Sequence, residues 1–219
     1  MKLVVASSNQ SKIAELASLL SGEVELLSLA DLRLDSPVED GATLLENALI
    51  KARAAAAATG LAAIADDSGL EVDAIDGAPG VRSARYAGPE ADDADNNAKL
   101  LTALNGVPAA ERGARFRSAV ALVLPDKVEL TACGAVEGRI GLVPRGEHGF
   151  GYDPLFELDD PNAVDYEDKT MAELTTTDKN RISHRGRAYR NLLAAIDAQS
   201  AQYPELSTLI ADREWEKSS

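Results

Sequence analysis

Residues 64–88 read IADDSGLEVDAIDGAPGVRSARYAG, an apolar start followed by two carboxylates and a glycine- and proline-rich continuation. The apolar run 62–65 predicts a short strand, and Ser68-Gly69 predicts its end because glycine permits unusual dihedral angles. Neighbouring side chains of a regular strand point to opposite faces, so Asp66 and Asp67 could share a site only at a strand end. We therefore expect both carboxylates to turn toward one cleft.

Two adjacent unneutralised carboxylates repel each other, so such a pair favours a divalent cation or a shared proton. In α/β proteins, ligands usually bind beyond the carboxyl ends of the strands, where this pair is expected. A solvated acidic turn is the alternative, because Asp, Ser and Gly are common in turns. These residues alone leave both interpretations open.

The composition describes an acidic globular chain. Its 219 residues, 45% hydrophobic and 26% charged, suffice for one large domain or two closely joined lobes. The net charge of −14 argues against binding along a nucleic acid backbone. Cys133 is the only cysteine, which excludes an intramolecular disulfide and fits a reducing compartment. No apolar run reaches the length of a signal peptide core or a membrane span, so we expect a cytoplasmic protein without a membrane partner.

Helical and strand-like patterns alternate on both sides of the opening stretch, with an antiparallel hairpin inserted. Thr43 and Glu46 form a capping-box pattern and Gly60 is expected to end that helix. The order favours an α/β fold with a mixed sheet. We expect one domain over residues 1–198 and an appended helix or tail over 199–219. The expected elements are strands at 2–6 and 24–29, a helix that follows Asn9 and ends near Ser21-Gly22, helices at 43–60 and 92–105, a hairpin of 116–124 and 128–136, and further helices beginning near Thr175 and Ser183.

The first loop reads ASSNQSK over residues 6–12 and lies between an expected strand and an expected helix. Backbone N–H groups at a helix N-terminus bind phosphate, and Ser7, Asn9 and Lys12 would add donors. Ordinary helix capping by Ser and Asn is the alternative. The chain contains neither GxxxxGK[ST] nor GxGxxG, which argues against a Walker loop and a dinucleotide enzyme.

Further residues could complete a nucleotide site. Glu39 could add an oxygen ligand beside the carboxylate pair, and Mg²⁺ suits such a set because it takes one or two carboxylates with waters and phosphates. Lys51, on the second expected helix, is either a phosphate ligand or an ordinary surface lysine.

A glycine-rich loop, GEHGFGYD over residues 146–153, carries two aromatic rings. Phe150 and Tyr152 are either a stacking platform for a base or a hydrophobic anchor for the loop. Lys179, His184 and Arg185 form a basic cluster at expected helix starts, where positive charge opposes the helix dipole. That local conflict hints at a functional role, with surface charge as the alternative.

The order and spacing of these blocks resemble the inosine triphosphate pyrophosphatase family, the non-canonical purine NTP pyrophosphatases of the Ham1/RdgB type. The resemblance spans about residues 1–198. It rests on the blocks ASSNQSK, ENALIKARAA, IADDSGLEVDAIDGAPGVRSARYAG, GFGYDPLF, KTMAEL and KNRISHRGRA.

The resemblance implies an elongated α/β sheet flanked by helices, with two lobes around a deep cleft, usually as a homodimer. It implies Mg²⁺-dependent hydrolysis of ITP, dITP, XTP and dXTP to the monophosphate and pyrophosphate. It also implies site residues at matching positions. They are Asp67 as catalytic base and metal ligand; Glu39 and Asp66 as further metal ligands, with Asp40 as the alternative to Glu39; and Ser7, Ser8, Asn9, Gln10, Ser11, Lys12, Lys51, Ser68, Phe150, Gly151, Tyr152, Asp153, Lys179, His184 and Arg185 as substrate-binding residues.

One position departs from the family pattern. The family's first loop usually reads T-G-N, whereas this chain has Ser7-Ser8-Asn9. Ser7 keeps the hydroxyl, but Ser8 adds a side chain where glycine lets phosphate approach the backbone.

Base selection is expected at the 6-position of the purine. A donor from His184 or Arg185 would pair with the 6-oxo oxygen of hypoxanthine or xanthine, whereas adenine presents an amino donor there. Two alternatives remain at this point: a Maf-like pyrophosphatase acting on modified or pyrimidine nucleotides, and a nucleotide-binding regulatory protein without turnover. The sequence does not rank ITP against XTP or the ribo against the deoxy forms.

Overall fold

The structure is a computed structural model that describes residues 1–20, 24–126, 128–199 and 201–209. Residues 21–23 and residues 210–219 of the expected tail lie outside these ranges. Among the described residues, no helix combines the length and the apolar character that crossing a bilayer requires.

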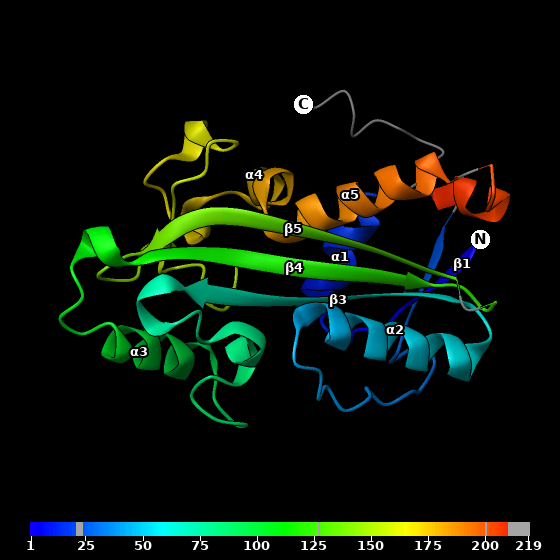
Figure 1. Ribbon diagram of the computed structural model, residues 1–219, viewed down its shortest axis with the longest axis horizontal. Helices are drawn as coiled ribbons and strands as arrows, with labels where there is room; N and C mark the ends of the chain where they lie inside the picture. The colour runs from blue at the N-terminus through cyan, green and yellow to red at the C-terminus, as the bar shows by residue number, and fades with distance from the viewer. Residues whose placement is uncertain (21–23, 127, 200, 210–219) are drawn as a thin grey trace. The chain divides into compact units, whose positions relative to one another are not determined.

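The described residues form a mixed sheet of six strands in the order β2-β1-β3-β4-β5-β6 (Figure 1). β1 is parallel to both β2 and β3, and β5 is antiparallel to β6. The predicted α/β fold with a mixed sheet is therefore confirmed. The strands are β1 (Lys2–Val5), β2 (Glu25–Ser28), β3 (Ala62–Val72), β4 (Gly113–Val123), β5 (Glu129–Ile140) and β6 (Phe156–Leu158).

The first helix, α1, ends at Ala17, four residues before the expected end at Ser21, so that prediction is wrong; the other expected helix bounds agree within two residues. In α2, Thr43 and Glu46 make the reciprocal capping box and Gly60 ends the helix in a left-handed conformation, as predicted. The α-helices are α1 (Gln10–Ala17), α2 (Leu44–Thr59), α3 (Asp93–Ala103), α4 (Thr176–Ile182) and α5 (His184–Ala198). Short 3₁₀ turns cover Asp73–Ile75, Gly80–Arg85, Ala109–Glu111, Val164–Tyr166, Met171–Glu173 and Pro204–Leu209.

The predicted break in the opening strand is wrong, because β3 continues through Ser68 and Gly69 to Val72. A Cβ at Gly69 would lie 2.4 Å from the carbonyl oxygen of Gly80. Glycine is therefore present so that another backbone segment can approach the strand, and it does not end the strand. Local composition could not distinguish these two uses of glycine.

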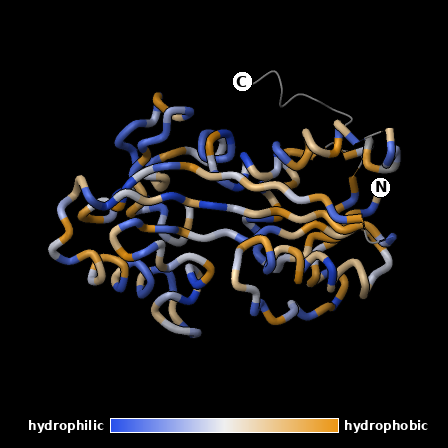
Figure 2. Tube along the Cα trace, in the orientation of Figure 1, coloured by the Kyte–Doolittle hydropathy of each residue, from blue (hydrophilic) through white to orange (hydrophobic). Residues whose placement is uncertain are grey.

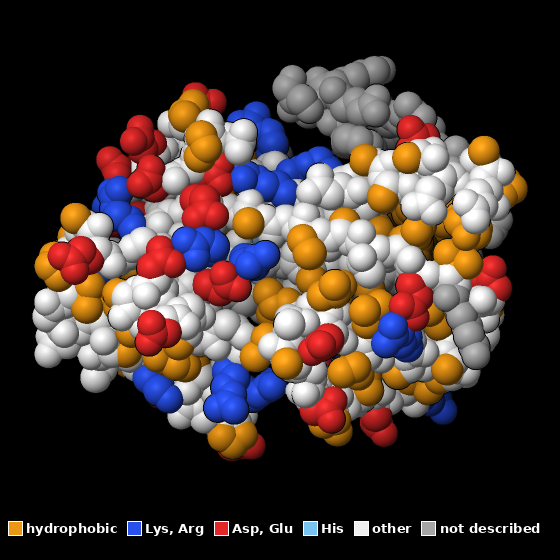
Figure 3. Space-filling model, viewed as in Figure 1, with side chains coloured by type: hydrophobic (Ala, Val, Ile, Leu, Met, Phe, Trp, Pro, Cys, Tyr) orange, Lys and Arg blue, Asp and Glu red, His pale blue; other side chains and the backbone are white. Residues whose placement is uncertain are grey.

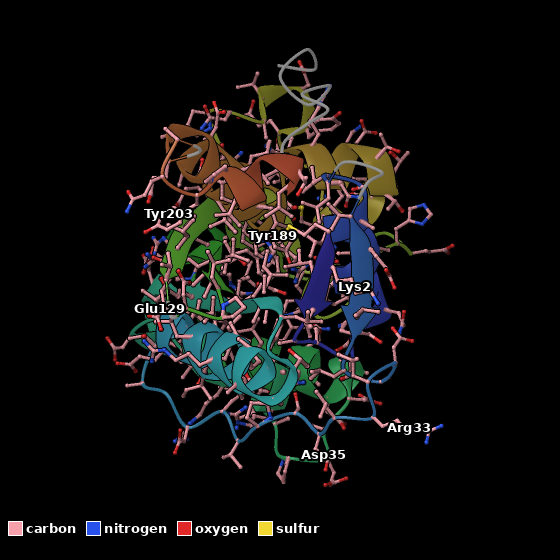
Figure 4. The ribbon with its side chains drawn as sticks, turned by 90° about the vertical axis from the view of Figure 1, so that its right-hand side faces the viewer. Lys2, Arg33, Asp35, Glu129, Tyr189 and Tyr203 are labelled. Atoms are coloured by element: carbon pink, nitrogen blue, oxygen red, sulfur yellow. The ribbon has the colours of Figure 1, made fainter. Side chains whose placement is uncertain are left out.

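Contacts within the chain define two compact units. The first unit contains residues 1–67, 118–134 and 185–219. Within it, α2 covers one face of the strands, and α5 covers the other (Figure 4). Alternate β1 residues enter two separate cores, Leu3 and Val5 with α5, and Val4 with the alanines of α2. Figure 2 shows the strands of this unit as strongly hydrophobic.

The second unit contains residues 68–117 and 135–184. Its core gathers Leu100 of α3 with aromatic side chains, and the Phe116 and Phe156 rings lie 4.5 Å apart between centroids. Basic and acidic side chains lie next to one another on its surface (Figure 3). Arg115, for example, pairs with Asp73 at 2.9 Å. Exposed pairs of this kind contribute little to stability.

Candidate active site

The side chain of Asp67 lies on the α2 side of the sheet in the first unit. Lys51 Nζ donates to both Asp67 Oδ1 and Glu39 Oε2, at 3.1 Å each. Asn47 Nδ2 donates to Asp67 Oδ2 at 3.2 Å. Asn47 and Lys51 are one helical turn apart, so α2 presents both to the same carboxylate. We call Glu39, Asn47, Lys51 and Asp67 the Asp67 group.

The charges of the Asp67 group do not cancel, because one ammonium faces two carboxylates. Burial raises the pKa of Asp67, and the charge of Glu39 adds to this effect, although Lys51 opposes it. Burial also acts to lower the pKa of Lys51, but Asp67 and Glu39 outweigh it, so that pKa is raised. The two carboxylates therefore share one ammonium, and the lysine is held as a cation.

The Asp67 group fits a cation that substrate helps to bind. In the part of the chain that the structure describes, no three His, Cys, Asp or Glu side chains come close enough to hold a metal alone. Glu39 and Asp67 nevertheless offer carboxylate oxygens on either side of the Lys51 ammonium. Mg²⁺ typically takes one or two carboxylates together with waters and substrate phosphates. The residues present therefore fit Mg²⁺ bound together with a polyphosphate.

Asp66 lies on the other face of β3. Its Oδ2 accepts from Lys12 Nζ at 2.8 Å and from Arg185 Nε at 3.1 Å, and its Oδ1 accepts from the Tyr189 hydroxyl at 3.3 Å. Arg185 also donates to Glu15 Oε2 at 2.6 Å. We call these five residues the Asp66 group.

The Asp66 carboxylate is fully charged despite its burial. Burial alone would raise the pKa of Asp66, but Lys12 and Arg185 hold it far below its ordinary value. Burial likewise acts against the charged form of Arg185, yet Asp66 and Glu15 raise its pKa. The opposite charges of this group are therefore paired, and the ion pair with Asp66 holds the Lys12 ammonium in place.

The prediction that Asp66 and Asp67 turn toward one cleft is wrong. Because β3 stays regular, neighbouring side chains point to opposite faces. Asp66 meets α1 and α5, whereas Asp67 meets α2. Asp66 therefore lies apart from Glu39 and Asp67, and its two oxygens already accept hydrogen bonds from cations and a tyrosine.

The first loop connects β1 to α1 as expected, and Asn9 caps the helix. Asn9 Oδ1 accepts from the backbone N–H groups of Ser11 at 2.9 Å and Lys12 at 3.2 Å. Ser7 Oγ accepts from Asn9 N–H at 3.1 Å. Ser8, Gln10 and Ser11 are exposed. The capping alternative therefore holds for Asn9, while exposed polar groups and the Lys12 ammonium lie at the same helix end.

In the second unit, the aromatic loop is held by a buried ion pair. Lys179 Nζ pairs with Asp153 Oδ2 and lies 4.6 Å from the centroid of the Phe150 ring. Phe150 is 37% exposed, so its ring remains accessible. Tyr152 is buried and its hydroxyl donates to the Ser83 carbonyl at 2.9 Å. Tyr152 is thus the hydrophobic anchor, and Phe150 is the exposed ring.

Two other predicted residues of this unit are less accessible. His184 is buried, and its ring stacks on Phe116 with centroids 4.9 Å apart. Ser68 is half-buried within β3. Arg185, expected in the nucleoside pocket, is instead only 2% exposed in the first unit, where it donates to the carboxylates of Asp66 and Glu15.

The sequence profile of the Ham1 family matches residues 3–195. This chain belongs to the Ham1 family. The resemblance drawn from the order of the motifs is therefore confirmed.

Ham1-family relatives match along almost the whole chain. A dITP/XTP pyrophosphatase of Nocardia farcinica is 51% identical, covering 90% of this chain and 95% of its own. One from Corynebacterium efficiens is 48% identical, covering 92% and 100%. The solved structure of a HAM1 protein from Coxiella burnetii is similar with a TM-score of 0.81 and 42% identity, covering 90% of this chain and 99% of that chain.

Sequence reasoning missed three residues of these groups in this Ham1-family chain. Asn47 reads as an ordinary helix residue, although its place four positions before Lys51 was a usable signal. Glu15 and Tyr189 lie on α1 and α5, and nothing local links them to Asp66. Figure 4 shows Tyr189 pointing from α5 toward the strands.

Proposed function

We propose that this chain hydrolyses deaminated purine nucleoside triphosphates, ITP, dITP, XTP and dXTP, to the monophosphate and pyrophosphate with Mg²⁺. The proposal rests first on the Asp67 group, in which Lys51 bridges Glu39 and Asp67 at 3.1 Å. A partly buried carboxylate pair beside a fixed ammonium suits a metal-bound polyphosphate. The names of the relatives support the substrate class.

Different residues of the first unit would bind the metal, activate the water and stabilise the charge on the phosphates. Glu39 and Asp67 would hold Mg²⁺, which neutralises charge on the phosphate oxygens when bound. Asp67 would orient the attacking water and accept its proton. Lys51 and Lys12 would stabilise the negative charge that develops at the α-phosphorus. Asp66 would act indirectly, because it holds Lys12 through a 2.8 Å ion pair.

The residues of the second unit would recognise the base. The exposed Phe150 ring would stack on the purine, and stacking of this kind contributes about 1–3 kcal/mol per base. His184 is the candidate donor to the 6-oxo oxygen. Arg185, expected to share that role, is proposed instead as a support for Asp66, because it bonds to Asp66 and Glu15.

A product assay tests the proposal. Pyrophosphate and monophosphate are measured with ITP, XTP, their deoxy forms, ATP, GTP, dUTP and modified pyrimidine triphosphates, with and without Mg²⁺. We expect turnover of the 6-oxo purines that requires Mg²⁺ and is lost in Asp67→Asn. A clear preference for pyrimidines would instead favour the Maf-like activity. Calorimetric binding of ITP without any product would indicate a regulatory protein.

The proposal also includes a homodimer, which rests on the family resemblance, and a cytoplasmic location, which rests on the single cysteine and the short apolar runs of the sequence. Light scattering on the full chain at micromolar concentration checks the first, since a homodimer has twice the mass of the chain. Cell fractionation checks the second. A monomer at all concentrations tested would refute the predicted dimer without affecting the proposed chemistry.

A further inference from the structure

Helix α3 holds the backbone of Gly151 by both its polar groups. The Gly151 N–H donates to Asp93 Oδ2 at 2.6 Å, and the Gly151 carbonyl accepts from Asn97 Nδ2 at 2.8 Å. Asp93 and Asn97 are one helical turn apart, so they share a face of α3. Asn97 Nδ2 also donates to the Asp93 carbonyl at 2.7 Å, which restricts its rotation.

Gly151 is the centre of the aromatic loop. Its φ of +63° is rarely adopted by residues with a side chain, and a Cβ placed there would meet nothing. Glycine is therefore required by the backbone conformation and not by space. The preceding residue, Phe150, is the exposed ring, and its N–H donates to Asp153 Oδ2 at 2.8 Å. The Gly151 N–H belongs to the peptide that joins Phe150 to Gly151, so its bond to Asp93, together with the Phe150 N–H bond to Asp153, restricts the backbone that carries the Phe150 ring.

Helix α3 is also held to the rest of the second unit by contacts other than the hydrogen bonds to Gly151. Asn96 is buried and bonds to the backbone of Ala87 at 2.8 Å and Ala84 at 3.3 Å. Leu100 and Leu104 of the same helix region are fully buried in the core. The bonds to Gly151 are therefore additional to those that hold the helix, and they act on the loop.

We propose that Asp93 and Asn97 are positioning residues for base recognition, which fix the Gly151 peptide so that Phe150 is ordered before a nucleotide binds. This inference rests on the proposed function of the Phe150 loop. A loop that is already ordered loses less conformational entropy on binding, which strengthens affinity without new contacts to the ligand. The effect should appear in affinity for ligands that carry the base.

The test compares Asn97→Ala with Asn96→Ala, the same substitution at the next position of α3. Inosine monophosphate, which carries the base, and inorganic tripolyphosphate, which lacks it, are used as competing inhibitors of ITP hydrolysis. In Asn97→Ala we expect KM for ITP and the inhibition constant of the monophosphate to rise roughly fivefold, the value of one net hydrogen bond. We expect inhibition by tripolyphosphate and kcat to stay close to wild type.

Asn96→Ala should lower thermal stability while leaving KM for ITP unchanged. The inference is overturned if Asn97→Ala leaves both KM and monophosphate inhibition unchanged. It is also overturned if both inhibitors weaken equally, because that indicates general damage. The wild-type chain is assayed first. If it does not hydrolyse ITP, the proposed function is refuted, and this outcome is distinct from a failure of the present inference.

Discussion

Replacing Asp66 and Asp67 singly by Asn should have opposite consequences, although the two residues are neighbours. Asp66 accepts from Lys12, Arg185 and Tyr189 and is 3% exposed. Asn has nearly the same shape but no charge, so Asp66→Asn leaves two cations facing an amide. Removing one partner of a buried ion pair costs about 3–5 kcal/mol.

The expected loss is measurable as a shift in melting temperature. For a chain of this size, 1 kcal/mol corresponds to about 2–4 °C. A loss of about 4 kcal/mol therefore lowers the melting temperature by roughly 8–16 °C. Asp67→Asn should change it by only a few degrees in either direction, because burial already disfavours the charged form of Asp67. Asp67→Asn should nevertheless abolish ITP turnover.

The pH dependence of stability separates the two carboxylates further. The pKa of Asp66 is lowered in the folded state, so its contribution is present above the unfolded value of about 3.9 and is lost as pH falls below it. The difference in free energy of unfolding between wild type and Asp66→Asn should thus be constant from about pH 8 to 5 and become smaller below about pH 4. The pKa of Asp67 is raised in the folded state, so its contribution to stability is fully present below the unfolded value of about 3.9 and is lost as pH rises through the folded value. Asp67→Asn should therefore gain stability relative to wild type toward neutral pH.

Thermal and urea unfolding followed by circular dichroism, at several pH values, measures these differences. Turnover of ITP at neutral pH provides the second readout for each variant. If the Asp66→Asn protein had the melting temperature of the wild type, the claim that the Asp66 charge compensates Lys12 and Arg185 would be refuted. An Asp67→Asn protein that is destabilised as strongly as Asp66→Asn would also contradict the reasoning, because the two groups would then be equivalent.

Three further substitutions follow from particular contacts. Thr43→Ala removes the cap of α2 and should lower the free energy of unfolding by about 1 kcal/mol, measured by urea titration; Thr102→Ala on α3 is the control. Gly69→Ala would place a Cβ 2.4 Å from a backbone oxygen and should cost roughly 1–3 kcal/mol; no change in the urea midpoint would contradict the close approach. Phe150→Ala should raise KM for ITP by roughly 5- to 150-fold with little change in stability, and an unchanged KM would refute stacking.

Much of the fold was predictable because the signals are local. The capping box of Thr43 and Glu46 and the stop at Gly60 involve residues within one turn of each helix end, so their pattern predicts the bounds of α2. The same holds for Asn9 at the start of α1. The alternation of helical and strand-like patterns with an inserted hairpin predicted the mixed sheet, and the order of the motif blocks predicted the family. Glu39, Lys51 and Asp67 were each expected in the site, although not the bonds that join them.

Only the tertiary structure decided which face each carboxylate occupies. Whether β3 ends or continues at Gly69 depends on the close approach of Gly80, eleven residues further along the chain. Once the strand continues, its alternation sends Asp66 to α1 and α5 and Asp67 to α2. Arg185 reaches Asp66 across 119 sequence positions. A sequence pattern reports neighbours along the chain, whereas charge pairing depends on neighbours in space, so the separate roles of Asp66 and Asp67 follow from packing alone.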